Sequence, residues 1–244
     1  DGRIQRLLAS RRLPYTGAGP EASALAMDKW AARQALSRAG VVVADGVLVS
    51  TADSPKSVAT QIAPLGWPVV VKPRHGGSSL GVSIVRSGED GGELAKALES
   101  ARKEEEEAVV ERFIPGREMT VGILGDRALP PVETLTPRGF YDYEAKYESG
   151  DTEYRVDPQM DPSDRERLLE AALRAFRALG CRGVGRADFR LPPGGAPVAL
   201  ELNTLPGLTE RSLLPKAAAK AGIPFDTLCA ALLDDARSGA GGRT

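Results

Sequence analysis

The feature that most constrains this chain is a pair of apolar segments joined by a short Pro/Gly turn near its carboxyl end. Residues 184–190 and 197–202 alternate apolar side chains with other residues, and Pro192-Pro193-Gly194-Gly195 lies between them. Two such segments around a turn predict an antiparallel hairpin. The residues after 203 predict a loop followed by a helix.

Three oxygen-bearing side chains lie on this hairpin. Glu201 and Asn203 are two residues apart, so on an extended strand they share one face, and cross-strand pairing can bring Asp188 opposite them. Two carboxylates and an amide oxygen are hard ligands of the kind that Mg²⁺ accepts. The alternative is that acids at strand ends are simply solvated. The combination with residues 204–207 and 212–215 is more specific than a lone acidic pair.

Composition narrows the class of protein. The 244 residues are 42% hydrophobic and 27% charged, as in an ordinary soluble protein, with 32 Lys and Arg against 33 Asp and Glu. This balance gives no overall basic field that would favour nucleic acid, and no run of 18 apolar residues predicts a membrane span. Cys181 and Cys229 have no CxxC pattern, which suits a reducing compartment, and we expect both to be buried small hydrophobes.

A second candidate site begins where the apolar strand at residues 68–72 ends in a lysine. Lys72 is followed by a segment rich in glycine and serine, through Gly81. Glycines let the backbone approach an anion, and the N–H and hydroxyl groups of Ser78 and Ser79 can surround phosphate oxygens. Taken alone, such a segment is more often just a turn, and it is not the P-loop. His75 is the one histidine of the sequence, and we interpret it as incidental to this loop.

The remaining patterns predict further helices and strands. One helix runs from a Ser23 cap to Arg38, and another spans 91–107 and ends in the acidic run 104–107, predicted to be a solvated face. Asp161, Pro162 and Gly180 mark the cap, first residue and stop of a strong helix. Strands are expected at 47–50, 82–85, 108–111 and 119–124, and closing helices at 212–221 and 225–236.

Four motifs together carry a family resemblance. They are Ala26-Met27-Asp28-Lys29, the segment Lys72–Gly81, Phe140-Tyr141-Asp142-Tyr143-Glu144-Ala145-Lys146-Tyr147, and Glu201-Leu202-Asn203-Thr204-Leu205-Pro206-Gly207. With them, nearly the whole chain resembles the D-alanine–D-alanine ligases of the ATP-grasp superfamily. The resemblance implies an α+β ATP-grasp fold, in which two α+β subdomains with antiparallel sheets clasp ATP between them.

The resemblance also implies a domain division. Residues 1–22 would be a remnant of an amino-terminal α/β domain, residues 23–115 the central subdomain, and residues 116–244 the carboxyl-terminal subdomain with the metal and substrate site. Most of the amino-terminal domain would be absent, together with the glutamate that orients the first substrate in the family. We therefore expect activity of the parent protein, while the isolated chain is expected to bind nucleotide but turn over poorly.

By resemblance, one set of residues is expected to bind ATP. The expected phosphate ligands are Lys29, Lys72, Ser79 and Lys146; Glu111, Phe113 and Ile114 would lie near the adenine, and Glu118 near the ribose. The alternative for residues 111–118 is a hairpin whose acids are merely exposed. Asp188, Glu201 and Asn203 would hold two Mg²⁺ (or Mn²⁺) ions.

A second set is expected to act on the reacting groups. Ser78 and Tyr147 would join in a hydrogen-bond network over the substrates, and a tyrosine at 147 is similar to the dipeptide-forming members of the family. Arg186 and the Gly207 N–H would stabilise a tetrahedral oxyanion. Ser212 and the Leu213 N–H, at a helix start, would hold the carboxylate of the second substrate.

The implied reaction joins two D-alanines at the expense of ATP, through D-alanyl phosphate. This dipeptide serves peptidoglycan precursor synthesis, and thus cell-wall biogenesis and cell shape, in the cytoplasm. The implied partners are D-alanine substrates and, for the full-length protein, a second copy in a homodimer. Two alternatives remain open at this point: another carboxylate–amine ligase, such as one that joins D-alanine to D-lactate, or a catalytically silent ATP-binding fragment.

Overall fold

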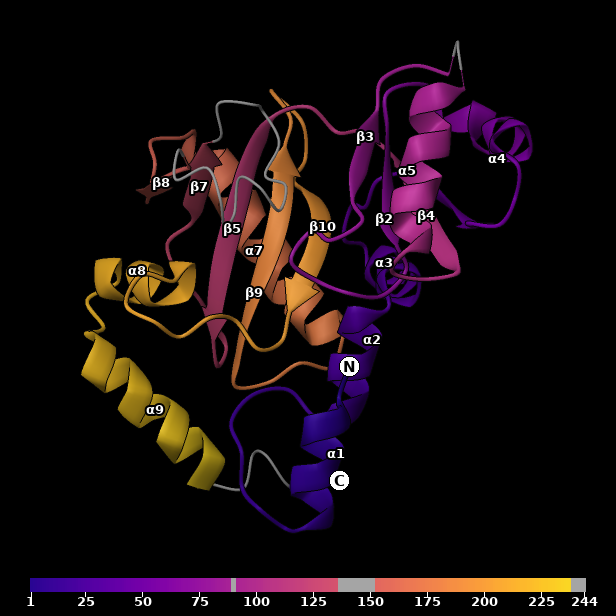
Figure 1. Cartoon of the computed structure of the whole chain (residues 1–244). Helices are drawn as coiled ribbons and strands as arrows, with labels where there is room; N and C mark the ends of the chain where they lie inside the picture. The colour runs from indigo at the N-terminus through magenta and orange to yellow at the C-terminus, as the bar shows by residue number, and fades with distance from the viewer. Residues whose placement is uncertain (89–90, 136–151, 238–244) are drawn as a thin grey trace.

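The computed structural model describes residues 1–88, 91–135 and 152–237, which form two antiparallel sheets with helices packed against them (Figure 1). The smaller sheet has the order β1-β4-β2-β3, and the larger has β10-β9-β5-β7-β8 with β6 paired to β5. The expected α+β architecture with antiparallel sheets is confirmed. The two sheets come from successive parts of the chain, so the space between them is bordered by both.

The smaller sheet lies between residues 46 and 112. It contains β1 (Gly46–Ser50), β2 (Val69–Pro73), β3 (Ser83–Val85) and β4 (Glu107–Arg112). Helices α4 (Pro55–Ile62) and α5 (Gly92–Arg102) cover one face, with the short 3₁₀ turn Ala63–Leu65 between α4 and β2. Val58, Ile62 and Leu94 pack there against strand residues such as Val69 and Val71, which gives this half its own core.

The larger sheet contains the predicted hairpin. Its strands are β5 (Arg117–Leu124), β6 (Arg127–Ala128), β7 (Val132–Leu135), β8 (Glu153–Val156), β9 (Val184–Leu191) and β10 (Val198–Asn203). Helix α7 (Pro162–Ala178) begins at the Asp161 cap as predicted, because the Asp161 carboxylate accepts from the Ser163 N–H. Gly180 follows with a φ of 68°, the left-handed conformation that ends many helices.

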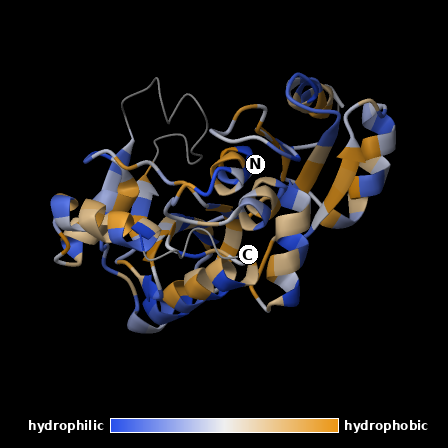
Figure 2. Cartoon of the chain, turned by 90° about the horizontal axis from the view of Figure 1, so that it is seen from below, coloured by the Kyte–Doolittle hydropathy of each residue, from blue (hydrophilic) through white to orange (hydrophobic). Residues whose placement is uncertain are grey.

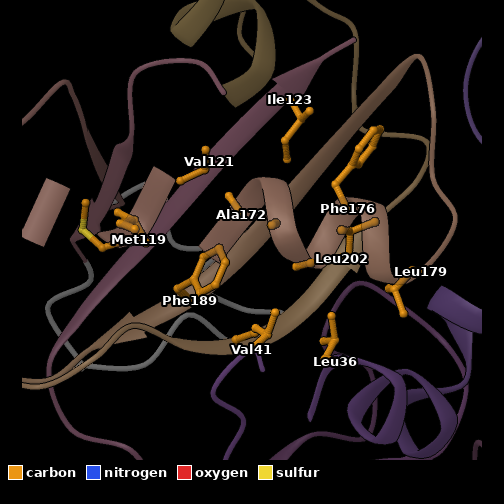
Figure 3. Packing of buried hydrophobic residues seen from close by; sticks show 14 of the residues in the cluster. Leu36, Val41, Met119, Val121, Ile123, Ala172, Phe176, Leu179, Phe189 and Leu202 are labelled. Atoms are coloured by element: carbon orange, nitrogen blue, oxygen red, sulfur yellow. The ribbon is translucent and has the colours of Figure 1, made fainter. Parts of the chain in front are cut away.

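The two central strands alternate between a core face and a polar face. Met119, Val121 and Ile123 of β5, with Ala187 and Phe189 of β9, point toward α7 and pack against its Phe176 and Ala172 (Figure 3). Thr120, Asp188 and Arg190 alternate with these residues and therefore lie on the opposite face. One face of the sheet therefore packs into the hydrophobic core, and the other face carries the polar side chains.

Helices α8 (Leu213–Lys220) and α9 (Phe225–Arg237) close the carboxyl end and form a further apolar cluster around Leu214 and Leu228. The helices carry both apolar and polar residues, as expected of helices with one face against a sheet (Figure 2). Within the described part of the chain, no helix has both the length and the apolar character needed to cross a membrane. Cys181 and Cys229 are free and partly buried rather than fully buried as expected.

The single helix predicted from Ser23 to Arg38 is wrong. The structure has two helices, α2 (Pro20–Met27) and α3 (Lys29–Arg38), after a first helix α1 (Arg3–Ser10). Asp28 separates them in an extended conformation and caps α3 through the N–H groups of Trp30 and Ala31. Ser23 lies inside α2 and is buried, so its hydroxyl caps no helix but accepts from Gln5 Nε2 at 3.2 Å.

Packing places α2 and α3 with the larger sheet. Ala32 and Leu36 of α3 belong to the same cluster as Phe189, and the Ala199 N–H of β10 donates to the Val42 carbonyl at 2.8 Å. The division at residues 22 and 115 stays a prediction. These contacts place the first crossing of the chain from the larger sheet to the smaller one between α3 and β1.

Candidate active site

A cavity of about 520 Å³ lies between the two sheets, within the range of small-molecule sites. Its lining includes every predicted site residue that the structure describes: Lys29, Lys72, Ser78, Ser79, Glu111, Phe113, Ile114, Glu118, Arg186, Asp188, Glu201, Asn203, Gly207, Ser212 and Leu213. Lys146 and Tyr147 lie outside the described residues. The predicted residues come from both halves of the chain and meet around one volume.

The acidic hairpin forms one wall of the cavity. Glu201 of β10 pairs with Asp188 of β9, and Asn203 pairs with Arg186, so the predicted opposition of Asp188 and Glu201 is confirmed. The register shifts between Ala199 and Glu201. Thr120 lies opposite Asp188 on β5, and its hydroxyl donates to Asp188 Oδ1 at 2.7 Å. Three adjacent strands thus position the carboxylate of Asp188.

The oxygens of this wall already have protein partners. Arg186 donates to Asp188 from Nε, at 3.1 Å to Oδ1, and from Nη2, at 2.9 Å to Oδ2. The Leu205 N–H donates to Asn203 Oδ1 at 3.0 Å. The described residues contain no group of three or more His, Cys, Asp or Glu that could hold a metal, but the predicted set needs only two carboxylates and one amide. Its donor chemistry fits Mg²⁺, which keeps waters and substrate phosphates in its shell.

Two lysines supply the positive charge on the other side. Lys72 Nζ lies 2.5 Å from Glu111 Oε2, and both side chains are almost buried, at 12% and 10% exposure. Lys29 Nζ donates to the Gly76 carbonyl at 2.8 Å. Loss of hydration on burial lowers the pKa of Lys29 from its ordinary value, although Glu201 opposes this shift. A phosphate group bound at this position would favour the charged lysine.

The Gly/Ser loop has a strained backbone at its two serines. Ser78 and Ser79 have φ values of 55° and 57°, in the left-handed region that side chains other than those of Gly and Asn rarely adopt. Such conformations typically cost about 1–3 kcal/mol each and gather at ligand-binding sites. The loop therefore presents its serines to the cavity in a conformation that the rest of the structure maintains.

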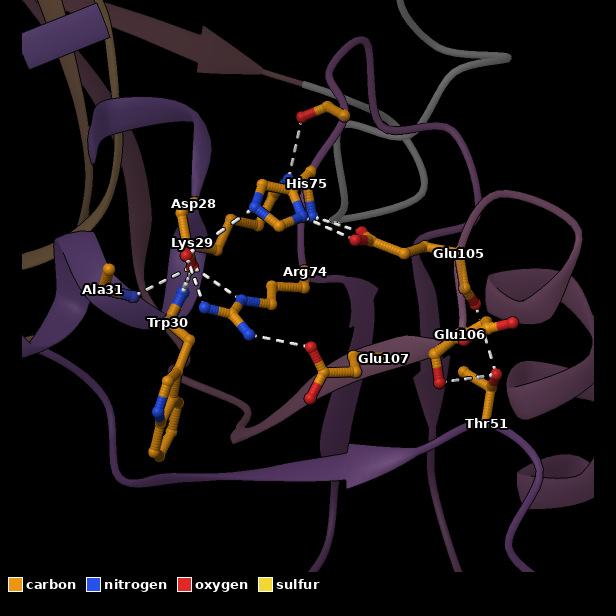
Figure 4. Close-up of polar contacts among 11 residues, drawn as sticks. Asp28, Lys29, Trp30, Ala31, Thr51, Arg74, His75, Glu105, Glu106 and Glu107 are labelled. Carbon is orange, nitrogen blue, oxygen red and sulfur yellow. Dashed lines mark hydrogen bonds and ion pairs between the residues drawn. The ribbon is translucent and has the colours of Figure 1, made fainter. Parts of the chain in front are cut away.

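An ion-pair network around Arg74 holds the start of this loop in place (Figure 4). Arg74 donates to both carboxylate oxygens of Asp28, at 3.0 and 2.6 Å, and to Glu107 Oε2 at 2.7 Å. The Lys29 N–H donates to the Arg74 carbonyl at 2.9 Å. The network thus ties the start of α3 to β2 and β4.

Two sequence interpretations are corrected by this network. The acidic run 104–107 is not helical, because α5 ends at Arg102 and Glu107 begins β4. Glu104 and Glu106 are exposed as predicted, whereas Glu105 and Glu107 are partly buried. His75 is not incidental: its Nδ1 lies 2.5 Å from Glu105 Oε1, and its backbone N–H donates to Glu105 Oε2 at 2.7 Å. The pairing of Pro73 with Ala108 brings these acids beside the loop, and sequence spacing alone could not show that.

The segment between β4 and β5 lines the part of the cavity where the adenine of ATP is expected. The Phe113 N–H donates to the Pro68 carbonyl at 3.0 Å, so Phe113 offers its ring rather than this N–H to a ligand. Glu118 forms an ion pair with Arg190, with 2.8 Å between Glu118 Oε2 and Arg190 Nη2. Adding a Cβ to Gly116 would place it 2.2 Å from the Leu191 carbonyl oxygen, so only glycine fits this bend.

The loop before α8 forms the last wall. Ser212 is the residue before the first turn of α8, and its hydroxyl accepts from the Thr209 N–H at 3.2 Å. A Cβ at Gly207 would lie 2.8 Å from Ser212 Oγ, so glycine permits this close approach. The expected oxyanion donor and the expected carboxylate site are therefore neighbours.

The lining residues that sequence reasoning missed include Thr120, Arg190 and Arg211. Arg190 is two residues beyond Asp188 on the same strand, so the period-two rule that paired Glu201 with Asn203 would have found it. Thr120 becomes visible only through the pairing of β5 with β9. Arg211 directly precedes Ser212, in a loop with no periodic pattern that would indicate which way its side chain points.

Comparisons with known proteins agree on one family. The family model described as D-ala D-ala ligase C-terminus matches residues 36–234. A D-alanine–D-alanine ligase of Geobacter sulfurreducens is 45% identical, covering 96% of this chain and 72% of that protein, and one of Synechococcus is 43% identical, with 97% and 72% covered. The chain thus spans about three-quarters of the length of these relatives.

Solved structures are similar in fold. The D-alanine–D-alanine ligase of Bacillus anthracis complexed with ATP aligns with a TM-score of 0.83 and 30% identity, covering 98% of this chain and 75% of that chain. The VanG D-Ala:D-Ser ligase of Enterococcus faecalis aligns with a TM-score of 0.84 and 30% identity, covering 96% and 68%. By family model, sequence identity and fold, the chain belongs to the D-alanine–D-alanine ligase family.

Proposed function

We propose that this protein uses ATP to ligate two D-alanine molecules into D-alanyl-D-alanine, a component of peptidoglycan precursors. The observation that carries the proposal is the convergence of the acidic hairpin, the Gly/Ser loop and the segment 111–118 on one cavity, in a chain of the ligase family. Phosphoryl transfer needs mainly positioning and charge neutralisation, and these side chains are suited to both.

The proposed nucleotide site crosses the gap between the sheets. Lys29, Lys72 and Ser79 would contact phosphates, while Phe113 and Glu118 would contact the base and the ribose. The proposal is supported by the two partly buried lysines beside the loop and by the presence of Phe113 in the cavity lining. Lys146 is proposed as a further phosphate ligand on resemblance alone.

The proposed chemistry has two steps. The carboxylate of the first D-alanine attacks the γ-phosphorus of ATP, ADP leaves, and D-alanyl phosphate forms. The amine of the second D-alanine then attacks the carbonyl carbon and loses a proton, and the tetrahedral oxyanion collapses with release of phosphate. Arg186 and the Gly207 N–H would stabilise that oxyanion, while Ser212 and the Leu213 N–H hold the second carboxylate. Ser78 and Tyr147 would cover the substrates.

Asp188, Glu201 and Asn203 are the residues that would hold magnesium. When bound there, Mg²⁺ would neutralise charge on the phosphate oxygens. Arg186 lies in the same region, since its Nη2 is 2.9 Å from Asp188 Oδ2, and its positive charge would favour a negative charge that develops there.

The test is product formation. The chain is incubated with D-alanine, ATP and Mg²⁺, phosphate release is followed, and the dipeptide is identified by mass spectrometry. D-alanine-dependent release above the rate of an Asp188→Asn variant is expected. ATP binding without dipeptide would favour the silent-fragment alternative, and an absence of ATP binding would contradict the proposal.

A second candidate is a ligase with a different second substrate. The similarity in fold to a D-Ala:D-Ser ligase favours including it. A panel of D-alanine, D-serine and D-lactate as second substrates, at equal concentrations, separates the candidates. A higher kcat/KM with D-serine or D-lactate than with D-alanine would replace the first proposal with the second.

Three expectations about the whole protein stay predictions. They are a homodimer of the full-length protein, a cytoplasmic location, and the three-part domain division at residues 22 and 115. Sedimentation of the full-length protein would test the dimer, and limited proteolysis would test the boundaries.

A further inference from the structure

Arg190 is a buried cation in the nucleotide half of the cavity. It lies on β9, two residues after Asp188, and its side chain is only 7% exposed. It lines the cavity together with Phe113 and Glu118. An arginine stays charged in proteins, so its burial requires fixed partners.

Three of its contacts fall on the segment from Phe113 to Glu118. Arg190 Nη2 lies 2.8 Å from Glu118 Oε2, and Nη1 donates to the Gly116 carbonyl at 3.0 Å. The guanidinium carbon lies 5.9 Å from the centroid of the Phe113 ring, within cation–π range. One side chain on β9 therefore holds the backbone bend, the aromatic ring and the carboxylate of this segment.

We propose that Arg190 is a positioning residue for the nucleotide, which orients the Glu118 carboxylate toward the ribose hydroxyls. The inference rests on the proposed function, because it takes ATP as the ligand. A carboxylate has room for about four hydrogen bonds, so Glu118 can accept from Arg190 and from a ribose hydroxyl together. Without the arginine, Glu118 would be an almost buried acid, 16% exposed, without this partner to fix its rotamer.

The consequence is selectivity for the 2′-hydroxyl. A hydrogen bond to a charged acceptor is worth enough to favour ATP over 2′-deoxy-ATP by about tenfold or more when its geometry is fixed. If Arg190 fixes that geometry, its removal lowers this ratio. A merely structural role would weaken both nucleotides equally and leave the ratio unchanged.

The experiment compares calorimetric dissociation constants of ATP and 2′-deoxy-ATP for the parent chain and its variants. Arg190→Met keeps the length of the side chain but removes the charge, and Arg190→Lys keeps the charge but not the two-sided donor geometry. Arg117→Met is the matched control, because Arg117 forms a similar pair with Glu133 on the same sheet, at 2.7 Å, and does not line this cavity. Glu118→Gln completes a double-mutant cycle with Arg190→Met.

The parent and Arg117→Met are expected to prefer ATP, while Arg190→Met and Glu118→Gln lose most of the preference and the double variant loses no more. Arg190→Lys is expected to fall between, and it tests the inference even if Arg190→Met does not fold. An unchanged ratio in both Arg190 variants, with ATP still bound, would overturn this inference alone. A parent that binds no ATP would overturn the proposed function and this inference together.

Discussion

At the scale of single residues, the cavity holds its charges in matched contacts before any ligand arrives. Lys72 lies against Glu111, Arg186 against Asp188, and Arg190 against Glu118. Each pair satisfies a partly buried charge, which would be costly if left alone. Binding of an anionic ligand therefore exchanges one set of charged contacts for another.

Arg186 gives the first prediction. Arg186→Ala should lower kcat for ligation by about 10²–10³-fold, because losing one donor to an oxyanion typically costs about 3–4 kcal/mol. The dissociation constant of ATP should change much less. The rate of phosphate release measures the first quantity and calorimetry the second. Arg155→Ala, which removes an exposed pair with Glu153, is the control and should retain the parent rate. Ligation at the parent rate by Arg186→Ala would remove Arg186 from this role.

Lys29 gives a pH-dependent prediction. Burial lowers the pKa of Lys29 in the free protein, and bound phosphate would favour the charged form, so binding is linked to proton uptake. ATP should bind most tightly below the free-protein pKa of Lys29 and more weakly as pH rises through it. This decline should begin at a lower pH than the ordinary lysine pKa of 10.5. In Lys29→Arg the part of this decline that is due to residue 29 should disappear, since arginine keeps its charge. Parallel profiles of ATP affinity for the two proteins would contradict the assignment.

At the scale of elements, strands and helices with strong local signals were predictable and their connections were not. The hairpin of β9 and β10 has alternating side chains and a Pro/Gly turn, and α7 has both of its end signals. Each of these signals lies within a few residues. At the break, Asp28 caps α3 locally, but its carboxylate also binds Arg74, a partner far along the chain. The acids after α5 lie beside the loop because β2 pairs with β4.

The same limit applies to the candidate site. Its convergence on one cavity was expected from the family resemblance rather than from spacing. The period of two along β9 places Arg190 on the same face as Asp188, but it does not show that Arg190 is buried. Its burial follows only from the position of Glu118 on the neighbouring strand β5, where Glu118 pairs with Arg190 itself.

Asp28 gives the element-scale prediction. Burial alone would raise its pKa, but the hydrogen bonds from Arg74 and the Ala31 N–H outweigh burial and lower the pKa below its ordinary value of 3.8. A lowered folded-state pKa contributes stability above pH 3.8, which is lost as pH falls through the folded-state value. Asp28→Asn should therefore be less stable than the parent at neutral pH, with the difference shrinking in acid.

Urea unfolding between pH 2 and 7 measures this difference. Asp161→Asn is the matched control, because Asp161 also caps a helix but receives its hydrogen bonds from Ser163. Its difference from the parent should be smaller. A pH-independent difference for Asp28→Asn would show that the carboxylate charge does not stabilise this junction.

At the scale of the whole molecule, two hydrophobic cores lie on either side of the cavity. The core around Val58 and Val69 belongs to the smaller sheet, and the core around Phe189 and Phe176 belongs to the larger one. A ligand that contacts both halves binds the folded chain only. Its binding free energy then adds to the free energy of unfolding.

ATP with Mg²⁺ should accordingly raise the melting temperature. At 100 times the dissociation constant, the gain is about 2.7 kcal/mol, which corresponds to a shift of roughly 5–10 °C for a chain of this size. Differential scanning calorimetry measures the shift. Inorganic triphosphate at the same concentration is the control, since it lacks the base and ribose. Equal shifts with both ligands would show that Phe113 and Glu118 contribute nothing to binding.

The bond between Asp28 and Arg74 has a mechanical consequence. Asp28 caps α3, which packs with the core of the larger sheet, whereas Arg74 directly follows β2 of the smaller sheet. Their ion pair therefore links the two sheets at one end of the cavity. The two sheets cannot move apart at this end of the cavity without breaking the hydrogen bonds between Arg74 and Asp28. We therefore expect any widening of the cavity during nucleotide binding to occur away from Asp28 and Arg74.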